Sequence, residues 1–447
     1  MEQTKRFART VCNLAVPVAL QSMLQSSFSI VDQIMIGQLG SVSVAGVGLA
    51  GKFSSIFSVL ASAIGAIAGI MISQYLGQKN KQEVSRSFYL NLLMVTAMAS
   101  VFTFLCMVFP QQIMGLYTQD HETQLAAASY LTILAGTFLP VAGATLLSTL
   151  FRCMEKASLP LYASIIAAAL NTGLNYVLIF GKLGFSSMGA DGAAIATLVS
   201  QIANLLIMLL LFWKYREILT SGRGADVRMS KFNWGQYGAM LLPILVCEFM
   251  WSLGENVYAA IYGHLGTESC AAMTLTNPIQ GIMIGALCGL SQAASVIVGK
   301  QLGTGAYDEA YDASKKLIQY GIVGSLLLSA VILLTSQFYV EIYQVEASVK
   351  ILASQILIAY AIVAPFKVLN MILGGGIIRS GGKTNYVMVI DLVGTWVFGV
   401  PLGLLSAFAL GLGIPFVYFI LSLEECIRFG ISVVVFRRKH WMQILKN

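Results

Sequence analysis

The sequence predicts an all-α, polytopic membrane protein with about twelve transmembrane helices in two pseudo-symmetric six-helix lobes. Three observations support this fold class. The composition is 57% hydrophobic and 11% charged, whereas an average soluble domain has roughly 25% charged residues. Long apolar stretches recur along the whole chain, and the first half of the sequence is repeated in the second. Lipid must therefore cover much of the surface.

The apolar stretches are long enough to cross a bilayer as helices, because a span needs about 20 mostly apolar residues. They are continuous rather than alternating, which favours helices over the strands of a barrel. Breaks at charged or glycine-rich turns place six spans at residues 11–37, 45–76, 88–110, 125–150, 159–181 and 189–213. Six more follow at residues 236–262, 272–299, 317–338, 350–377, 385–406 and 409–436.

The longest polar stretch between spans divides the chain near its middle. We expect an N-terminal lobe at residues 1–213, a cytoplasmic linker at 214–235 and a C-terminal lobe at 236–447. All but four of the 27 lysines and arginines lie on one side of the membrane in this map. By the positive-inside rule, both termini are cytoplasmic. This orientation explains the net charge of +7, so a nucleic-acid partner is not expected.

The internal repeat is a direct one. A shift of 226 residues aligns residues 14–83 with residues 240–309 without a gap, and it places Pro17 on Pro243 and Gly40 on Gly266. Six spans separate matching positions, so the two halves have the same orientation in the membrane. Pro17 and Pro243 each remove a backbone hydrogen bond early in the first helix of a half, which makes both helices candidate hinges.

No motif for catalysis or metal binding stands out. The nearest stretch to a phosphate-binding loop, Gly376 to Thr384, has one residue too many between its glycines. The three histidines lie at predicted loops or chain ends, and no nucleophile and base are suitably spaced. We therefore expect neither an enzyme nor a bound cofactor or metal.

Asp32 is the most prominent ionisable residue within a span. Gln25 lies one heptad earlier and Gln21 on a nearby turn, so a polar stripe runs along the first helix. Burial disfavours the charged form of a carboxyl, so Asp32 is a candidate for taking up a proton. The alternative is a structural carboxylate near a helix end.

The seventh span carries an acidic and aromatic face. Glu248 and Glu255 are one heptad apart, and Trp251 and Tyr258 follow them at helical spacing. Such a face suits an organic cation through charge and cation–π attraction, although packing aromatics with a paired carboxylate would look the same. Candidate partners lie on other spans: Lys367 for the glutamates, and Asp391 as a further acid that needs a partner of its own.

Two further groups of polar residues lie inside spans. Asn171 and Asn175, one helical turn apart in the fifth span, either line a hydrogen-bonding pocket or hold neighbouring helices together. Glu424, Glu425 and Arg428 could form a network within the last span.

In combination, these features resemble the multidrug and toxic compound extrusion (MATE) transporter family. The resemblance covers essentially the whole chain. Residues 14–50 (LAVPVALQSMLQSSFSIVDQIMIGQLGSVSVAGVGLA) are similar to the family's first helix and following loop. Residues 189–197 (GADGAAIAT) resemble the start of its sixth helix, and residues 374–384 (GGGIIRSGGKT) resemble the end of its tenth.

The resemblance implies two lobes around a central cleft, alternating access, and export coupled to the entry of protons or sodium ions. Asp32 matches the family's first-helix Asp. Asn175 stands where archaeal-type members have a second Asp, and this loss of charge weakens a sodium site more than a proton site. Glu248 or Glu255 is similar to a seventh-helix Glu of other members, and Lys367 takes the place of their tenth-helix Asp.

We therefore expect a proton-coupled antiporter that exports cationic or amphipathic small molecules, with sodium as the alternative ion. Asp32, Glu248 and Glu255 are the expected coupling residues. The chain is expected to be a monomer whose only other partner is lipid, in the cytoplasmic membrane of a prokaryote. A lipid or lipid-linked sugar flippase is the alternative, but it would need more basic residues inside the spans. The residues expected to line the substrate cleft are Gln21, Gln25, Asn171, Asn175, Trp251, Tyr258, Lys367 and Asp391.

The charge distribution generates a topological prediction. Cysteines introduced singly at Ser221 in the linker and at Gln119 in the opposite set of loops, in a cysteine-free background, should react with a membrane-impermeant thiol reagent from opposite sides. In intact cells, Gln119→Cys should be labelled and Ser221→Cys should be protected. Labelling of Ser221→Cys only from outside would contradict the assigned orientation.

Overall fold

The first half of the chain folds as long apolar helices with one bent pair. The computed structural model describes residues 2–215, 233–343 and 345–445, and these contain helices and turns without a strand. Five helices are single spans, whereas α5 and α6 are bent by 47° at their break and form one broken span. In chain order the helices are α1 (Glu2–Gly37), α2 (Ser41–Gly77), α3 (Lys81–Val108), the short α4 (Pro110–Gly115), α5 (His121–Ala135), α6 (Phe138–Cys153), α7 (Ser158–Phe180) and α8 (Gly189–Tyr215).

The second half contains six more spans, two of which include π-helical turns. The first three are α9 (Trp234–His264), α10 (Thr267–Gly303) and α11 (Tyr307–Glu341). The fourth joins α12 (Ala347–Asn370) to the π-helix η3 (Met371–Ile378). The fifth runs through α13 (Thr384–Leu392), η4 (Val393–Gly399), α14 (Val400–Leu404) and η5 (Leu405–Ala409), and the sixth is the pair α15 (Ile414–Ser422) and α16 (Glu424–Arg437).

The twelve-span fold class is confirmed by these helices. Ten helices of the described chain are long and apolar enough to cross a membrane, and the bent pair α5–α6 raises the number to 11. The twelfth span, α15–α16, has three charged residues near its centre, Glu424, Glu425 and Arg428, and all three are buried. The charges of this span therefore lie inside the protein.

The fourth expected span, residues 125–150, is a bent pair of helices. It is divided between α5 and α6, with a break at Gly136 and Thr137. Pro140 lies in the first turn of α6, where it cannot donate a backbone hydrogen bond to the preceding turn. Gly136 at the break also admits a leucine of α8, since a Cβ there would lie 3.0 Å from Leu198 Cδ1.

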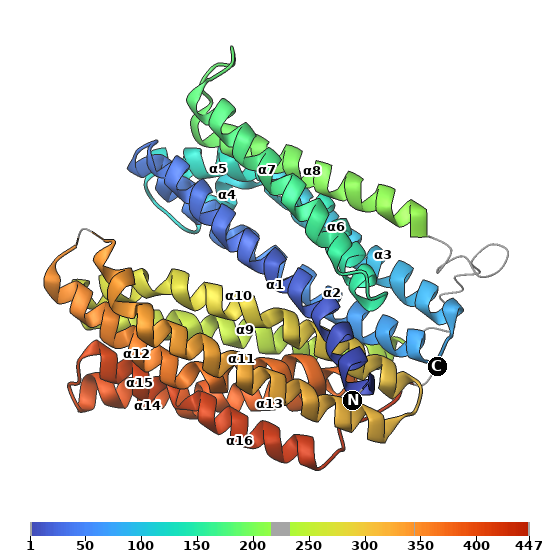
Figure 1. The fold of residues 1–447 in the computed structure, drawn as a ribbon. Helices are drawn as coiled ribbons and strands as arrows, with labels where there is room; N and C mark the ends of the chain where they lie inside the picture. Colours follow the sequence, from blue (N-terminus) through green and yellow to red (C-terminus); the bar gives the residue numbers. More distant parts are fainter. Residues whose placement is uncertain (1, 216–232, 344, 446–447) are drawn as a thin grey trace. The chain divides into compact units, whose positions relative to one another are not determined.

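Backbone contacts divide the chain into two compact units. One comprises Leu20–Met229, and the other comprises Met1–Ala19 together with Ser230–Asn447. Within the second unit, α11 and α12 lie side by side with α10 against both of them (Figure 1). The expected linker is mostly outside the described residues, because 216–232 are not described.

The internal repeat is visible in the backbone. The helices α2 and α10 are both 37 residues long, and each begins and ends 226 positions from its counterpart. Their N-cap glycines have nearly the same conformation, with φ of 96° at Gly40 and 108° at Gly266. A side chain is disfavoured at this φ, which explains why glycine occupies both positions. Pro17 and Pro243 also match, each inside an uninterrupted helix.

A short tail after α16 folds back onto the second unit. Trp441 is fully buried, and its indole N–H donates to the carbonyl of Phe436 at 3.2 Å. The Phe436 ring stacks between Trp441 and Tyr311, with centroid distances of 5.9 and 4.8 Å. The carbonyl of Trp441 lies against the turn before α13, so close that a Cβ on Gly381 would overlap it.

Gly381→Ala should therefore destabilise the second unit. The added methyl group forces either the turn or the tail to move, which costs about 1–3 kcal/mol. Thermal unfolding of the purified chain in detergent measures the effect. Gly430→Ala is the matched control, because a Cβ on this α16 glycine meets no atom within 4 Å. An equal fall in unfolding temperature for both variants would show that the contact with Trp441 is unimportant.

Candidate coupling sites in the two units

Asp32 lies against the two asparagines of α7 in the first unit. The Asn175 amide donates to Asp32 Oδ1 at 2.6 Å and is also 3.2 Å from the Asn171 side-chain oxygen. Asn171 and Asn175 are buried, and Asp32 is half-buried. The helices α1 and α7 thus hold one carboxylate beside two amides.

The amides complete a hydrogen-bonded cluster that includes α8. Asn171 donates to the Thr197 hydroxyl at 3.3 Å. With its amide turned over, the nitrogen of Asn171 would lie 3.1 and 3.2 Å from the two Asp32 oxygens. The Asn175 side-chain oxygen is buried without a hydrogen-bond partner. The cluster therefore has donors for an ionised Asp32 and a spare acceptor for a protonated one.

The rest of the expected polar stripe on α1 is less closely connected. Gln21 donates to the Ser164 hydroxyl of α7 at 2.8 Å, and Gln25 is exposed. Gln21 therefore joins α1 to α7 about three turns from Asp32, whereas Gln25 remains available for other contacts.

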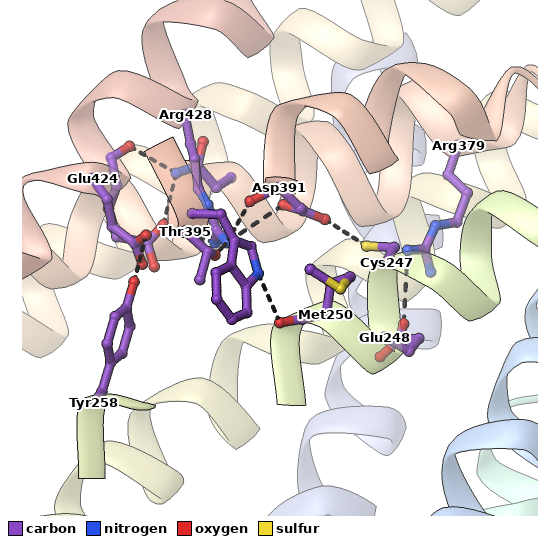
Figure 2. Close-up of polar contacts among 12 residues, drawn as sticks. Cys247, Glu248, Met250, Tyr258, Arg379, Asp391, Thr395, Glu424 and Arg428 are labelled. Carbon is purple, nitrogen blue, oxygen red and sulfur yellow. Dashed lines mark hydrogen bonds and ion pairs between the residues drawn. The ribbon is translucent and has the colours of Figure 1, made fainter. Parts of the chain in front are cut away.

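The second unit contains a larger polar network around α9, α13 and α16, drawn in Figure 2. Glu248 of α9 forms an ion pair with Arg379, with an Nη2 to Oε1 distance of 3.8 Å. The neighbouring Cys247 thiol donates to Asp391 Oδ2 at 2.7 Å. This hydrogen bond joins α9 to α13.

Arg428 of α16 lies at the centre of this network. Its guanidinium donates to Thr395 Oγ1 at 2.5 Å and to the Asp391 carbonyl at 3.4 Å. Its Nη atoms are 3.9 Å from the Asp391 carboxylate and 3.8 Å from the Glu425 carboxylate. Arg428 is only 6% exposed, and its Nε has no hydrogen-bond partner. Gly394 leaves room for it, because a Cβ there would overlap the arginine side chain.

Two carboxylates next to each other on α16 have different partners. Glu425 accepts from the Asn370 amide at 2.8 Å in addition to its contact with Arg428. Glu424 accepts from the Tyr258 hydroxyl of α9 at 2.8 Å. A Cβ on Gly399 of η4 would overlap both Tyr258 and Glu424, so this pair is closely packed against the backbone.

The residues of the acidic and aromatic face expected on α9 differ in their exposure. Trp251 is 46% exposed and Glu255 is also exposed, whereas Tyr258 is 5% exposed and bonded to Glu424. Lys367, the expected partner of the glutamates, is half-buried, and in the described chain the ion pair of Glu248 is with Arg379 instead.

Several members of the network were not expected as site residues. Arg379 lies within the motif at residues 374–384, and Asn370 and Thr395 have no distinctive spacing. The expected network within the last span is present as the Arg428–Glu425 pair. Polar residues at buried positions of apolar spans were the available signal, but the sequence does not indicate which helix supplies each partner.

Comparisons with known proteins give one consistent result. The family model MatE matches residues 17–177 and 243–405. The uncharacterized transporter YisQ of Bacillus subtilis (strain 168) is 20% identical over 96% of this chain and 94% of that protein. The probable multidrug resistance protein NorM of Agrobacterium fabrum (strain C58 / ATCC 33970) is 26% identical over 90% and 87%. Multidrug and toxin extrusion protein 1 of Homo sapiens is 25% identical over 91% and 70%.

Solved structures show the same fold. The crystal structure of the Vibrio cholerae MATE transporter VcmN in the bent form superposes with a TM-score of 0.88 and 17% identity, covering 98% of each chain. The outward-facing conformation of a multidrug resistance MATE family transporter superposes with a TM-score of 0.84 and 18% identity, covering 96% of this chain and 95% of that one.

Arg428→Met should destabilise the second unit strongly. Loss of the guanidinium leaves the buried Glu425 and the half-buried Asp391 without their shared cation, which costs about 3–5 kcal/mol. Arg379→Met is the control, because its ion pair with Glu248 is more exposed and should contribute about 1 kcal/mol or less. Unfolding of both variants in detergent tests the difference. Equal stability of the two variants would contradict a central role for Arg428.

Proposed function

Because the chain belongs to the MatE family of transporters, we propose that it exports cationic or amphipathic organic molecules in exchange for protons, by alternating access. Members of this family are transporters, and the chain is not an enzyme. The names of the relatives, multidrug resistance protein and multidrug and toxin extrusion protein, support small organic molecules as the substrate class. On α9, Trp251 and Glu255 are exposed and suit contact with an organic cation.

The contact between Asp32 and Asn175 is the observation that favours the proton over sodium as the coupling ion. Asp32 has amide nitrogens as neighbours, one at 2.6 Å, and a single carboxylate offers little negative charge to a metal ion. An ionised Asp32 accepts hydrogen bonds from these amides. A protonated Asp32 can donate to the unpartnered oxygen of Asn175 once that amide turns. Both charge states of the carboxyl therefore have partners within the same cluster.

The remaining parts of the proposal follow the repeat and the charge distribution. We place the functional lobes at residues 1–213 and 236–447, with Pro17 and Pro243 as hinges. Both termini are cytoplasmic in this proposal, and the chain is a monomer in the cell membrane. Glu248 and Glu255 are secondary candidates for ion coupling.

A lipid or lipid-linked sugar flippase is not favoured. An anionic lipid head group would require unpaired basic side chains within the spans. The two arginines of the second-unit network, Arg379 and Arg428, are both in contact with carboxylates instead. No observation therefore favours this alternative over the export of organic cations.

Transport in proteoliposomes tests the proposed function. The purified chain is reconstituted with a fluorescent organic cation inside, and efflux is driven separately by a pH gradient and by a sodium gradient. We expect efflux under the pH gradient and none under the sodium gradient alone. Efflux driven only by sodium would overturn proton coupling.

Asp32→Asn should abolish efflux driven by the pH gradient and leave substrate binding largely intact, because asparagine keeps the shape of the side chain but cannot change its charge. Asp32→Glu should keep some activity with an altered pH profile. Normal efflux by a well-expressed Asp32→Asn chain would remove Asp32 from the mechanism.

Asp120→Asn is the matched control, since Asp120 caps α5 outside the spans. Its carboxylate accepts from the Thr123 backbone N–H at 3.1 Å. Hydrogen bonds from Thr123 lower the pKa of Asp120, so this carboxyl stays ionised at neutral pH. Asparagine is also a good N-cap residue, and efflux should be unchanged.

A further inference from the structure

The polar network of the second unit contains more acids than paired bases. Its carboxyl side chains are Glu248, Asp391, Glu424 and Glu425, and the cations in ion pairs with them within the described residues are Arg379 and Arg428. Four acids and two paired cations leave an excess of negative charge if all of them are ionised. An uncompensated charge is expensive away from water, so one carboxyl has reason to hold a proton.

Geometry identifies which carboxyl this is. Glu248 is paired with Arg379, and Asp391 and Glu425 are both within 4 Å of Arg428. Glu424 is 5% exposed, and within the described residues it takes part in no ion pair. Its hydrogen bond is with the uncharged Tyr258 hydroxyl.

The ionisable groups around Glu424 come from several helices. Arg428 and Glu425 lie on its own helix α16, Tyr258 is supplied by α9, and Lys367 acts on it from α12. On α13, Asp391 is already engaged by Arg428 and by the Cys247 thiol. Glu255 and Tyr262 of α9 also lie in the surroundings of this group, since the charges of both Glu255 and Glu424 act on Tyr258 and Tyr262. Arg428, one turn along the same helix, is a positive charge that could respond if Glu424 ionises.

We propose that Glu424 carries a second proton of the export cycle and that Tyr258 transmits its charge state to α9. This inference rests on the proposed function, proton-coupled export. Ionised Glu424 binds the Tyr258 hydroxyl as an acceptor and attracts Arg428, whose buried Nε lacks a partner. Protonated Glu424 loses that attraction. Each transfer adds or removes one proton at the carboxyl, with no covalent change elsewhere.

Close packing favours a proton over a metal ion at this position. The backbone at Gly399 lies so near that a Cβ would overlap Tyr258 and Glu424 together. A metal ion requires a shell of oxygen ligands, whereas a proton requires only the carboxyl. Arg428 also occupies the position from which a metal ion would compensate the charges of Asp391 and Glu425.

Infrared spectroscopy of the purified full chain tests proton occupancy without transport. A protonated carboxylic acid has its own carbonyl band, distinct from the bands of carboxylates. We expect a component of this band that disappears on raising the pH and is missing from Glu424→Gln, while the component from Asp32 remains. Glu341→Gln is the control, because this exposed glutamate pairs with Lys350 and should leave the band unchanged. A Glu424→Gln spectrum identical to that of the wild type would overturn the inference.

Tyr258→Phe provides a second variant that keeps the aromatic packing. Without the hydroxyl, the ionised form of Glu424 loses its hydrogen-bond donor. The band should therefore persist to higher pH than in the wild type. An unchanged pH dependence would overturn the proposed link between Glu424 and α9, even if Glu424→Gln fails to fold.

Efflux assays connect this residue to export. Glu424→Gln should lower efflux driven by the pH gradient by about tenfold or more, equivalent to at least about 1.4 kcal/mol. Substrate affinity should change by less than about twofold, because Glu424 is buried. A wild-type chain that is inactive under a pH gradient overturns the proposed function. An active wild type with an equally active Glu424→Gln chain overturns this inference alone.

Discussion

The cost of placing charge away from water is the constraint on which the rest of this structure depends. In lipid, backbone groups must bond to one another, and the described residues of every span are accordingly helical. Side-chain charges obey the same constraint. Arg428 is buried together with Glu424 and Glu425 in the middle of the last span, which only mutual compensation makes tolerable. The twelfth span therefore depends on contacts with other helices, which surround its three charged side chains.

The two units satisfy this constraint in different ways. In the first, Asp32 is surrounded by neutral amides of α7, which can serve either charge state of the carboxyl. In the second, Arg428 compensates Asp391 and Glu425 as a fixed internal cation. A carboxyl whose partners are amides has partners in both its ionised and its protonated form. A carboxyl paired with a fixed arginine is favoured in its ionised form. Among the second-unit acids, Glu424 differs because within the described residues it takes part in no ion pair, and its hydrogen bond is with the Tyr258 hydroxyl.

Backbone geometry is what allows the second network to form. Within η4, Gly394 leaves space for Arg428, and Gly399 leaves space for Tyr258 and Glu424. The π-helical turn changes the direction in which successive side chains point, and such turns are frequent at functional sites. Any movement of α9 or α16 therefore acts on the backbone of η4. The charged side chains of Arg428 and Glu424 are in close contact with the η4 backbone, so their charge is coupled to the positions of the helices that carry them.

The spans, the direct repeat and the match of Gly40 with Gly266 could all be predicted from the sequence, because hydropathy and internal similarity are read along the chain itself. Asp32 and Asn175 were identified as site residues from their place inside apolar spans and from the family resemblance. Only the tertiary structure decided which side chains meet. Tyr258 reaches Glu424 across 166 residues, and Glu248 pairs with Arg379 rather than with Lys367. Such pairings depend on how far each helix is rotated about its axis and where it bends, and many distant contacts set these together.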